Sequence, residues 1–276
     1  MKTLYLDCGM GAAGDMLTAA LWELLPQEDR AGFLDELNGL GIPGVRFACE
    51  PAVKCGITGT HVTVTVDGRE EDEHMHEHHH HEGEHDHHDH EHPHEHTHEH
   101  GHHHTHHHSG MYDIEHIVSG HLNLPEKVKQ DVLAVYGLIA QAESHAHGVP
   151  VPDIHFHEVG TMDAVADVTA VCLLMARLAP EQVVVSPVHV GCGQVRCAHG
   201  ILPVPAPATA HILTGVPIYG GMIQGELCTP TGAALLKHFA TRFGDMPVMT
   251  LQAVGYGMGK KDFEAANCVR AMLGEA

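Results

Sequence analysis

A histidine-rich tract interrupts this chain between His74 and His108, and it limits what the chain can fold into. These 35 residues hold 21 histidines, interleaved with Glu and Asp, with no Lys or Arg and almost no apolar side chain. Such a segment has no hydrophobic periodicity to offset the entropy lost on ordering its backbone. The sequence therefore predicts a disordered insertion at residues 69–110 between two folded halves, 1–68 and 111–276.

The tract has the composition of a transition-metal binder, because neutral imidazole is a good ligand for nickel, copper, zinc and iron. It contains no cysteine and only one thioether, Met75, so nickel and zinc are favoured over copper(I). An expression tag is the alternative, but the tract is internal, irregular and mixed with acidic residues. We expect it to hold several exchanging ions and to raise the metal concentration near the folded halves. Its ligands include His78, His79, His80, His102, His103 and His104.

Charge and composition exclude several classes of partner. The formal net charge is −22, and only 12 of the 36 acidic residues lie between Glu70 and Glu99, so the folded part is acidic too. An acidic surface disfavours binding to nucleic acid and to anionic membranes. No apolar run is long enough to cross a membrane, and the eight cysteines are scattered without a signal peptide. We expect a cytoplasmic protein with reduced thiols, for which a homo-oligomer is compatible with the sequence.

Strand and helix patterns alternate along the folded halves, which predicts a mixed α/β fold interrupted by the insertion. An apolar strand at residues 3–8 leads through a glycine turn into a helix from Met16 to Leu25. Further helices are predicted at 28–40, 112–119, 125–145, 163–178 and 229–239, with a short one after the proline-rich residues 202–210. Further strands are predicted at 45–50, 60–66, 183–190, 250–254 and 267–272.

The densest group of potential ligands runs from His155 to Asp167. On an extended segment His155 and His157 project to the same face, and Asp163 and Asp167 lie one turn apart on the following helix. With Glu158, these side chains would converge at a strand-to-helix turn as a metal or catalytic site. The alternative is that Asp163 complements the helix N-terminus and that the histidines are hydrogen-bonded core residues.

A second group places two histidines and two cysteines within eleven residues around flexible glycines. Its members are His189, Cys192, Cys197 and His199. Their spacing matches no standard zinc ribbon or finger, so a metal site and an ordinary glycine hairpin both remain open. Arg196 and His199 could equally bind an anionic substrate.

Two turns offer backbone amides to an anion at the start of a helix. One contains Asp7 and the glycines before the first helix, and the other begins at Thr229. The alternative for each is simple N-capping, by Asp15 or by Thr229. The residues concerned are Asp7, Gly11, Gly14, Asp15, Thr229 and Thr231. Neither turn is a G-x-x-x-x-G-K-[ST] loop, and the whole chain lacks one, which separates it from histidine-rich GTPases that deliver nickel.

These motifs resemble the nickel insertion proteins that complete the nickel-pincer nucleotide cofactor of lactate racemase. The resemblance covers nearly the whole chain outside the tract, and members of that family carry a histidine-rich insertion at the same place. The matching strings are D-C-x-x-G-x-x-G-D-M from Asp7, H-F-H-E-V-G-x-x-D-x-x-x-D from His155, S-P-V-x-V-G from Ser186 followed by H-G-x-L-P-V-P-A-P-A-T, E-L-x-T-P-T-G-A-A-L-L from Glu226 and G-Y-G-x-G from Gly255.

The resemblance implies a nickel chelatase of the lyase class that performs a CTP-dependent cyclometallation. Nickel would enter a pyridinium-3,5-bisthiocarboxylate mononucleotide through two Ni–S bonds and one Ni–C bond, with release of CMP and pyrophosphate. A base must take the ring proton as the carbon–nickel bond forms. We expect His157 or Glu158 to be that base or a transient nickel ligand. The residues expected around them are His155, Asp163, Asp167 and His199.

Members of the family continue well beyond the position of Ala276, and their C-terminal part is associated with metal and CTP binding. We therefore expect this chain to be the N-terminal, nickel-handling portion, with CTP and its divalent metal held by a C-terminal nucleotide-binding half. Apo lactate racemase is a further partner that the resemblance implies.

Two other functions compete with this interpretation. A nickel store or chaperone without chemistry would need only the tract, whereas residues 155–236 concentrate His, Cys, Asp and glycine turns beyond what storage requires. A zinc-dependent hydrolase is weaker, because the chain has no H-E-x-x-H helix.

Overall fold

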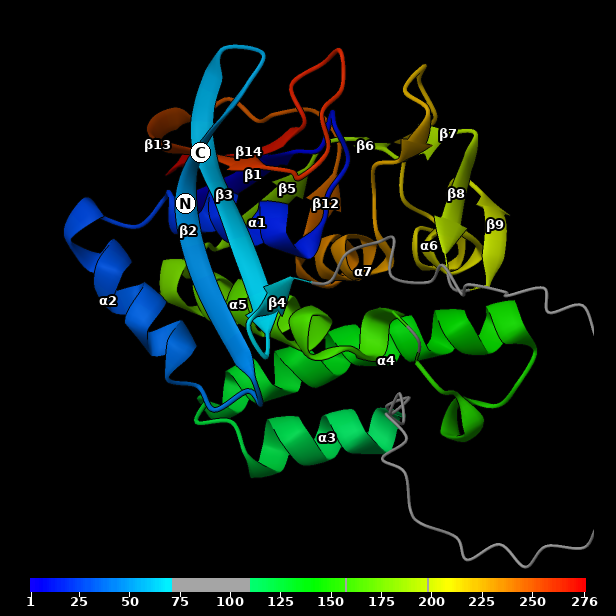
Figure 1. The fold of residues 1–276 in the computed structure, drawn as a ribbon. Coiled ribbons are helices and arrows are strands. Elements are labelled where there is room, and N and C mark those ends of the chain that lie inside the picture. Colours follow the sequence, from blue (N-terminus) through cyan, green and yellow to red (C-terminus); the bar gives the residue numbers. More distant parts are fainter. Residues whose placement is uncertain (71–109, 157, 198) are drawn as a thin grey trace, which may run out of the picture.

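The computed structural model describes residues 1–70, 110–156, 158–197 and 199–276. The predictions made for the histidine tract, for His157 and for the side chain of Glu158 lie outside what it describes. The mixed α/β class predicted from the sequence is confirmed by the described residues (Figure 1).

A mixed sheet of eight strands forms the frame of the described part of the chain. Its order is β12 (Arg242–Phe243), β5 (Gln182–Val185), β1 (Lys2–Asp7), β14 (Cys268–Glu275), β13 (Thr250–Met258), β3 (Ile57–Val66) and β2 (Val45–Lys54), with β4 (Arg69–Glu70) paired to β3. β1 runs parallel to β5 and antiparallel to β14. Strands from before and after the tract thus share one sheet, and the division into two halves stays a prediction.

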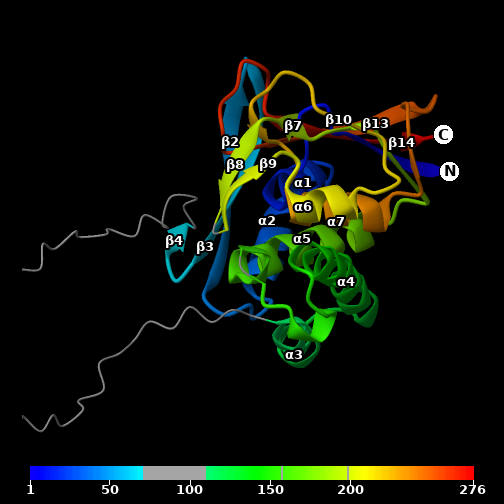
Figure 2. The ribbon, with the colours of Figure 1, turned by 90° about the vertical axis from the view of Figure 1, so that its right-hand side faces the viewer.

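The helices lie on one side of strands β1, β13 and β14 (Figures 1 and 2). They are α1 (Gly14–Trp22), α2 (Gln27–Asn38), α3 (Met111–Gly120), α4 (Glu126–His147), α5 (Met162–Leu178), α6 (Pro207–Ile212) and α7 (Pro230–Phe239). No helix of the described residues is long and apolar enough to cross a membrane.

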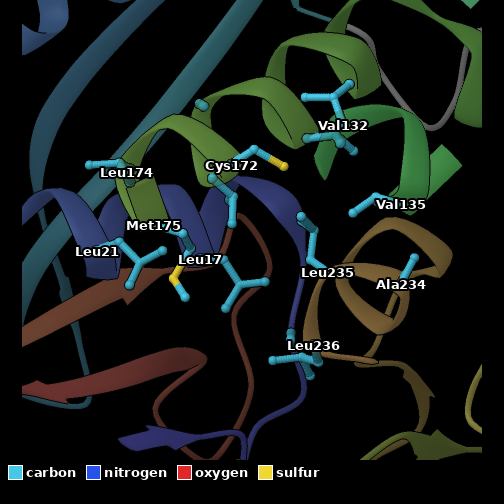
Figure 3. Packing of buried hydrophobic residues seen from close by; sticks show 14 of the residues in the cluster. Leu17, Leu21, Val132, Val135, Cys172, Leu174, Met175, Ala234, Leu235 and Leu236 are labelled. Carbon is cyan, nitrogen blue, oxygen red and sulfur yellow. The ribbon is translucent and has the colours of Figure 1, made fainter. Parts of the chain in front are cut away.

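Helix α5 is the centre of the core, because it is apolar on nearly every side and contacts α1, α4 and α7. Figure 3 shows Met175 of α5 near Leu17 of α1, with Leu235 of α7 and Val135 of α4 in the same cluster. Burial of such side chains stabilises a fold by roughly 1.5–3 kcal/mol each. The packed core therefore fixes the positions of the N-terminal ends of α1, α5 and α7 relative to one another.

Short strands follow β5 in the chain and form separate two-stranded sheets. These pairs are β6 (Val188–His189) with β10 (Ile218–Tyr219), β7 (Gly191–Cys192) with β11 (Gly225–Glu226), and β8 (Gln194–Cys197) with β9 (Gly200–Pro203).

Two local predictions are wrong. The strand predicted at 183–190 ends at Val185, because Pro187 has no N–H for the sheet, and the chain turns away before β6. The turn before α5 does not follow a strand: 3₁₀ turns at Val151–Asp153 and Glu158–Gly160 connect α4 to α5 instead. The remaining helices and strands predicted from periodicity are present, with bounds shifted by a few residues.

Candidate functional site

The two predicted anion-binding turns lie side by side. The backbone N–H of Ala12 donates to Leu227 (3.0 Å), and that of Thr229 donates back to Ala12 (3.0 Å). Gly11 has a φ of 80°, and a Cβ there would collide with the carbonyl of Leu227, so only glycine fits. The Thr229 hydroxyl accepts from the N–H of Gly232 (3.2 Å), so Thr229 is the N-cap of α7.

Three aspartates from α1 and α5 meet where these helices approach closely. A Cβ added to Gly14 would lie 2.6 Å from the Cβ of Asp167, so the glycine allows α1 to contact α5 here. One carboxylate oxygen of Asp163 and one of Asp167 are buried and have no hydrogen-bond partner among the described residues. An unpaired buried acceptor is costly, so this cluster is suited to hold a proton or a cation.

The surroundings of the cluster raise the pKa of two of its aspartates, Asp15 and Asp167. Burial raises the pKa of Asp167 well above its ordinary value, and the charges of Asp15 and Asp163 raise it further. Burial also raises the pKa of Asp15, although the N–H of Met16 and the neighbouring His61 oppose the rise. These carboxylates therefore keep protons to a higher pH than exposed aspartates do.

The segment with the motif H-F-H-E-V-G is anchored by its apolar residues. Ile154 and Phe156 are 2% and 1% exposed, and the Phe156 ring lies 5.9 Å from that of Tyr136. The Tyr136 hydroxyl donates to the carbonyl oxygen of Val159 (3.2 Å). Between the two buried residues, His155 faces the solvent. Burial raises the pKa of Tyr136, and the charges of Asp163 and Asp167 add to this rise, so the aspartates lie near the motif.

The described chain ends at Glu70 before the tract and resumes at Gly110 after it. A Cβ added to Gly110 would lie 3.4 Å from the carbonyl oxygen of Ile154, directly before His155. Glu70 forms an ion pair with Lys260 (3.2 Å), whose charge acts on Asp15. Both attachment points of the tract are therefore close to the aspartates or to the motif.

The structure adds histidines that the sequence interpretation missed. His147, in the last turn of α4, has its ring 4.8 Å from that of His199, and its Nε2 atom lies 3.3 Å from Oε2 of Glu143. His145 stacks on His211 of α6 with ring centroids 4.3 Å apart. The signal for the first group was present in the sequence, since Glu143 and His147 lie one helical turn apart.

The second predicted group is divided between two places. Residues 194–203 form a β-hairpin, as one of the two alternatives predicted, and it carries His199 to α4. Arg196 is exposed on β8, and the thiol of Cys192 donates to the carbonyl of Ile223 (3.3 Å). Cys197, at the end of β8, is partly buried.

His189 lies at the other place, buried beside the turn after β1. Its Nδ1 and Nε2 atoms are each 2.9 Å from a backbone oxygen, those of Gly9 and Gly220. Its ring stacks on Tyr219 with centroids 4.6 Å apart and an angle of 11°. In this conformation neither nitrogen of His189 points to a free coordination position.

A cavity of about 1010 Å³ opens beside this histidine, and its walls include Gly9, Met10, Tyr219 and Met222. A second cavity of about 350 Å³ shares Gly9 and Met10 and contains the ion pair between Asp7 and Arg270 (2.6 Å). Tyr219 and Arg270 were not predicted as site residues, because no local pattern marks them. The two cavities combine an aromatic face with a guanidinium, a combination suited to a planar, anionic ligand.

No three His, Cys, Asp or Glu side chains within the described ranges already surround one point as the ligands of a metal do. The polar groups of the site thus form three neighbourhoods: the aspartates of α1 and α5, the histidines at the end of α4, and the cavities at the end of β1.

Comparisons with known proteins give one consistent result. The family model described as "Nickel insertion protein" matches residues 4–276. A pyridinium-3,5-bisthiocarboxylic acid mononucleotide nickel insertion protein of Desulfitobacterium hafniense is 38% identical over 282 residues, covering 100% of this chain and 59% of the relative. Proteins of the same description from Clostridium kluyveri and Staphylococcus saprophyticus are 39% and 35% identical, covering 100% and 98% of this chain and 62% and 59% of their own lengths. The chain thus spans about three fifths of these relatives, and no solved structure matches it.

Proposed function

Because this chain belongs to the nickel insertion protein family, we propose that it handles nickel for insertion into a pyridinium-3,5-bisthiocarboxylic acid mononucleotide. The observation that carries the proposal is that the family match runs over residues 4–276, so that it includes the described fold on both sides of the tract and not the tract alone. A nickel store would need only a ligand-rich tract. A chain whose described fold follows the family on both sides of the tract is expected to take part in the family's chemistry and not only to store the metal.

The reaction sets three physical tasks. Nickel held loosely must reach an anionic sulfur chelate, the substrate must be oriented, and a ring proton must leave as the carbon–nickel bond forms. We propose His157 or Glu158 as the proton acceptor or as a transient nickel ligand, within the anchored motif. Asp167 would support it, because a carboxyl whose pKa is raised keeps its proton to a higher pH than an exposed aspartate does.

We propose the cavities at the end of β1 as the binding site of the mononucleotide. A volume of about 1010 Å³ lies at the upper end of the range for small-molecule sites. The pyridinium ring, a planar cation, would stack on Tyr219, and Arg270 would bind the phosphate. The seven residues from Gly9 to Asp15 are joined by six Cα–Cα steps and cannot span more than about 22 Å. The cavity wall at Gly9 is therefore linked by one short stretch of chain to Asp15, the aspartate of α1 in the cluster.

We assign the CTP-dependent step to the part of the longer relatives that this chain does not span. With CTP and its divalent metal bound there, the lyase reaction would need both parts, and apo lactate racemase would receive the product. This division explains how a chain without a P-loop could serve a nucleotide-driven reaction. A cytoplasmic location suits a biosynthetic reaction of this kind.

The test is a reconstitution. The chain is incubated with nickel, the mononucleotide and CTP, with and without the separately produced remainder of a relative, and the nickel-containing product is measured by mass spectrometry. We expect product only when both parts are present. Product from this chain alone, or micromolar CTP binding to it in calorimetry, would contradict the division between the two parts.

Two variants test the residue roles in the same mixture. His157→Ala and Glu158→Gln should abolish product while bound nickel per chain stays near the wild-type level, since the tract is intact. His116→Gln, at an exposed histidine of α3, is the control and should retain turnover. If both motif variants kept wild-type turnover, the motif would be abandoned in favour of residues 189–199. Nickel binding with no product under any condition would favour the store or chaperone.

A further inference from the structure

We propose that His147, Glu143 and His199 form a nickel(II) acceptor site at the C-terminal end of α4, which takes ions from the tract. The proposal rests on the proposed function for the destination of the ion. Nickel binding at this site does not depend on the proposed function, because the three ligands all belong to the described part of the chain. None of the residues of α4 was among the predicted ligands.

The geometry of the three side chains is close to that of a chelate. Neighbouring ligands on an ion with bonds of about 2.1 Å lie roughly 3 Å apart when they subtend a right angle. Nε2 of His147 and Oε2 of Glu143 are 3.3 Å apart, one helical turn from each other on α4. The ring of His199 lies 4.8 Å from that of His147 at an interplanar angle of 43°. The proposed site requires these neighbouring side chains to turn so that all three donors face one ion, since no three donors of the described residues do so without it.

The electrostatics at this position favour a divalent cation. His147 is the last residue of α4, a helix of 22 residues, and the C-terminal end of a helix carries a partial negative charge. The carboxylate of Glu143 adds a full negative charge beside the imidazole. Two imidazoles and one carboxylate form a nitrogen and oxygen donor set of the kind that nickel(II) accepts.

The exposure of the ligands suits exchange and not permanent storage. The side chains of His147 and Glu143 are 35% and 17% exposed, so water can fill the remaining coordination positions. In the ion-free arrangement no three donors of the described residues are already directed at one point. A site that closes only around the ion releases it more readily than a preformed, buried one.

The position of the site connects the tract with the motif. After α4 the chain passes through Gly148 and the 3₁₀ turn Val151–Asp153 to Ile154 and His155. Gly110, where the described chain resumes after the tract, lies against Ile154. The end of α4 and the resumption of the described chain after the tract are thus both joined to Ile154, the first through a short connecting segment and the second by direct approach.

A second histidine pair provides the matched control. His116 and His121, at the end of α3, have their Nε2 atoms 3.1 Å apart and are exposed. This pair consists of two imidazoles without a carboxylate, so it offers one metal ligand fewer than the proposed site. Removing them changes the histidine count equally but leaves the proposed site intact.

The first experiment measures nickel retained by the full chain against a competing chelator. The wild type, the His147→Ala/His199→Ala double variant and the His116→Gln/His121→Gln control are loaded with nickel chloride and dialysed against nitrilotriacetic acid. At a chelator concentration where the wild type still retains nickel, we expect the site variant to lose one nickel per chain and the control to lose none. Equal retention in all three proteins would overturn the site. The substituted histidines of the site are exposed or partly exposed surface groups, and circular dichroism checks that the variants fold.

The second experiment locates the ion. Crystals of the full chain soaked in nickel chloride should show an anomalous peak at the nickel edge between His147 and His199. Glu143→Gln should weaken that peak at equal soaking concentration. Peaks elsewhere on the folded part, with none at the end of α4, would overturn the proposal.

The outcome for the site can be separated from the outcome for the proposed function. Loss of one retained nickel in the site variant, together with no product in the reconstituted reaction of the wild type, would leave the site standing and remove the function. Unchanged nickel retention together with normal product formation by His147→Ala at limiting nickel would remove the site and leave the function.

Discussion

Asp7 and Arg270 are direct partners across the antiparallel pair of β1 and β14, and the guanidinium donates a hydrogen bond of 2.6 Å to the carboxylate. The first and the last strand in chain order, β1 and β14, are neighbours in the sheet. They thus place Arg270, paired with Asp7, in the wall of a cavity. Hydrogen bonds to Asp7 and Tyr256 hold the Arg270 guanidinium in one orientation, and the N–H groups beyond these two bonds can donate to an anion.

Arg270→Ala should weaken binding of the mononucleotide by roughly 10- to 100-fold, because a charge-assisted hydrogen bond contributes about 1.5–3 kcal/mol. Calorimetry with the pyridinium mononucleotide measures this directly. Arg46→Ala, an exposed arginine on β2, is the control and should leave the affinity unchanged. Equal affinity of the wild type and Arg270→Ala would place the phosphate elsewhere.

Asp167→Asn should stabilise the protein at pH 7 by about 1 kcal/mol, because it removes a carboxylate that burial and the charges of Asp15 and Asp163 disfavour. The pKa of Asp167 is raised in the folded state, so this carboxyl binds more protons in the native protein than in the unfolded chain above about pH 4. The contribution of Asp167 to the free energy of unfolding of the wild type therefore falls as the pH rises through that range.

Urea unfolding of both proteins at several pH values checks the sign of this effect. The two curves should coincide below about pH 3, where the carboxyl of Asp167 is protonated in both states, and separate as the pH rises. The other ionisable groups around Asp167 and Asp15 are Asp163, Tyr136, His61 and Lys260, and they are unchanged in the variant. An asparagine variant that is less stable by the same amount at every pH would show that the hydrogen bond from the backbone N–H of Asp15 to Asp167 outweighs the unfavourable burial of the charge.

Gly14→Ala should destabilise the fold by about 1–3 kcal/mol, because the new Cβ would lie 2.6 Å from the Cβ of Asp167 and separate α1 from α5. Gly137→Ala is a matched control inside α4, where an added Cβ meets nothing within 4 Å. That substitution should stabilise by about 0.5–1 kcal/mol through helix propensity. Thermal unfolding measures both effects: the melting temperature should fall for Gly14→Ala and rise for Gly137→Ala. A shift of both melting temperatures in the same direction would contradict the packing role of Gly14.

Deletion of residues 74–108 should lower the bound nickel several-fold, since the tract holds 21 of the 32 histidines. The described fold has its core outside the tract, so circular dichroism should show unchanged secondary structure. Product formation at saturating nickel, with the remainder of a relative supplied, should be largely retained. Nickel binding by the intact chain should also weaken as the pH falls through about 6.5, where free imidazoles become protonated. Loss of folding or of all activity on deletion would show that the tract is more than a reservoir.

The sequence by itself determined the elements and the family. The apolar periodicity of α4 and α5, the capping threonine of α7 and the composition of the tract are local properties, readable from neighbours within one or two turns. The resemblance to the nickel insertion proteins rested on the sequence motifs, and the family match over residues 4–276 confirms it. The prediction of one strand through Pro187 was wrong. It relied on the apolar composition of the segment and gave too little weight to proline, which has no N–H to donate to a sheet.

Only the tertiary structure decided which groups meet. Periodicity shows which face of an element is buried but not what covers it. The pairing of Asp7 with Arg270 spans 263 residues and depends on β14 lying beside β1. The contact of Asp167 with the turn at Gly14 depends on how α1 packs on α5, and that of His147 with His199 on where the hairpin of β8 and β9 ends. These contacts are set by sheet order and helix packing, which emerge from the whole core and leave no mark on any single segment.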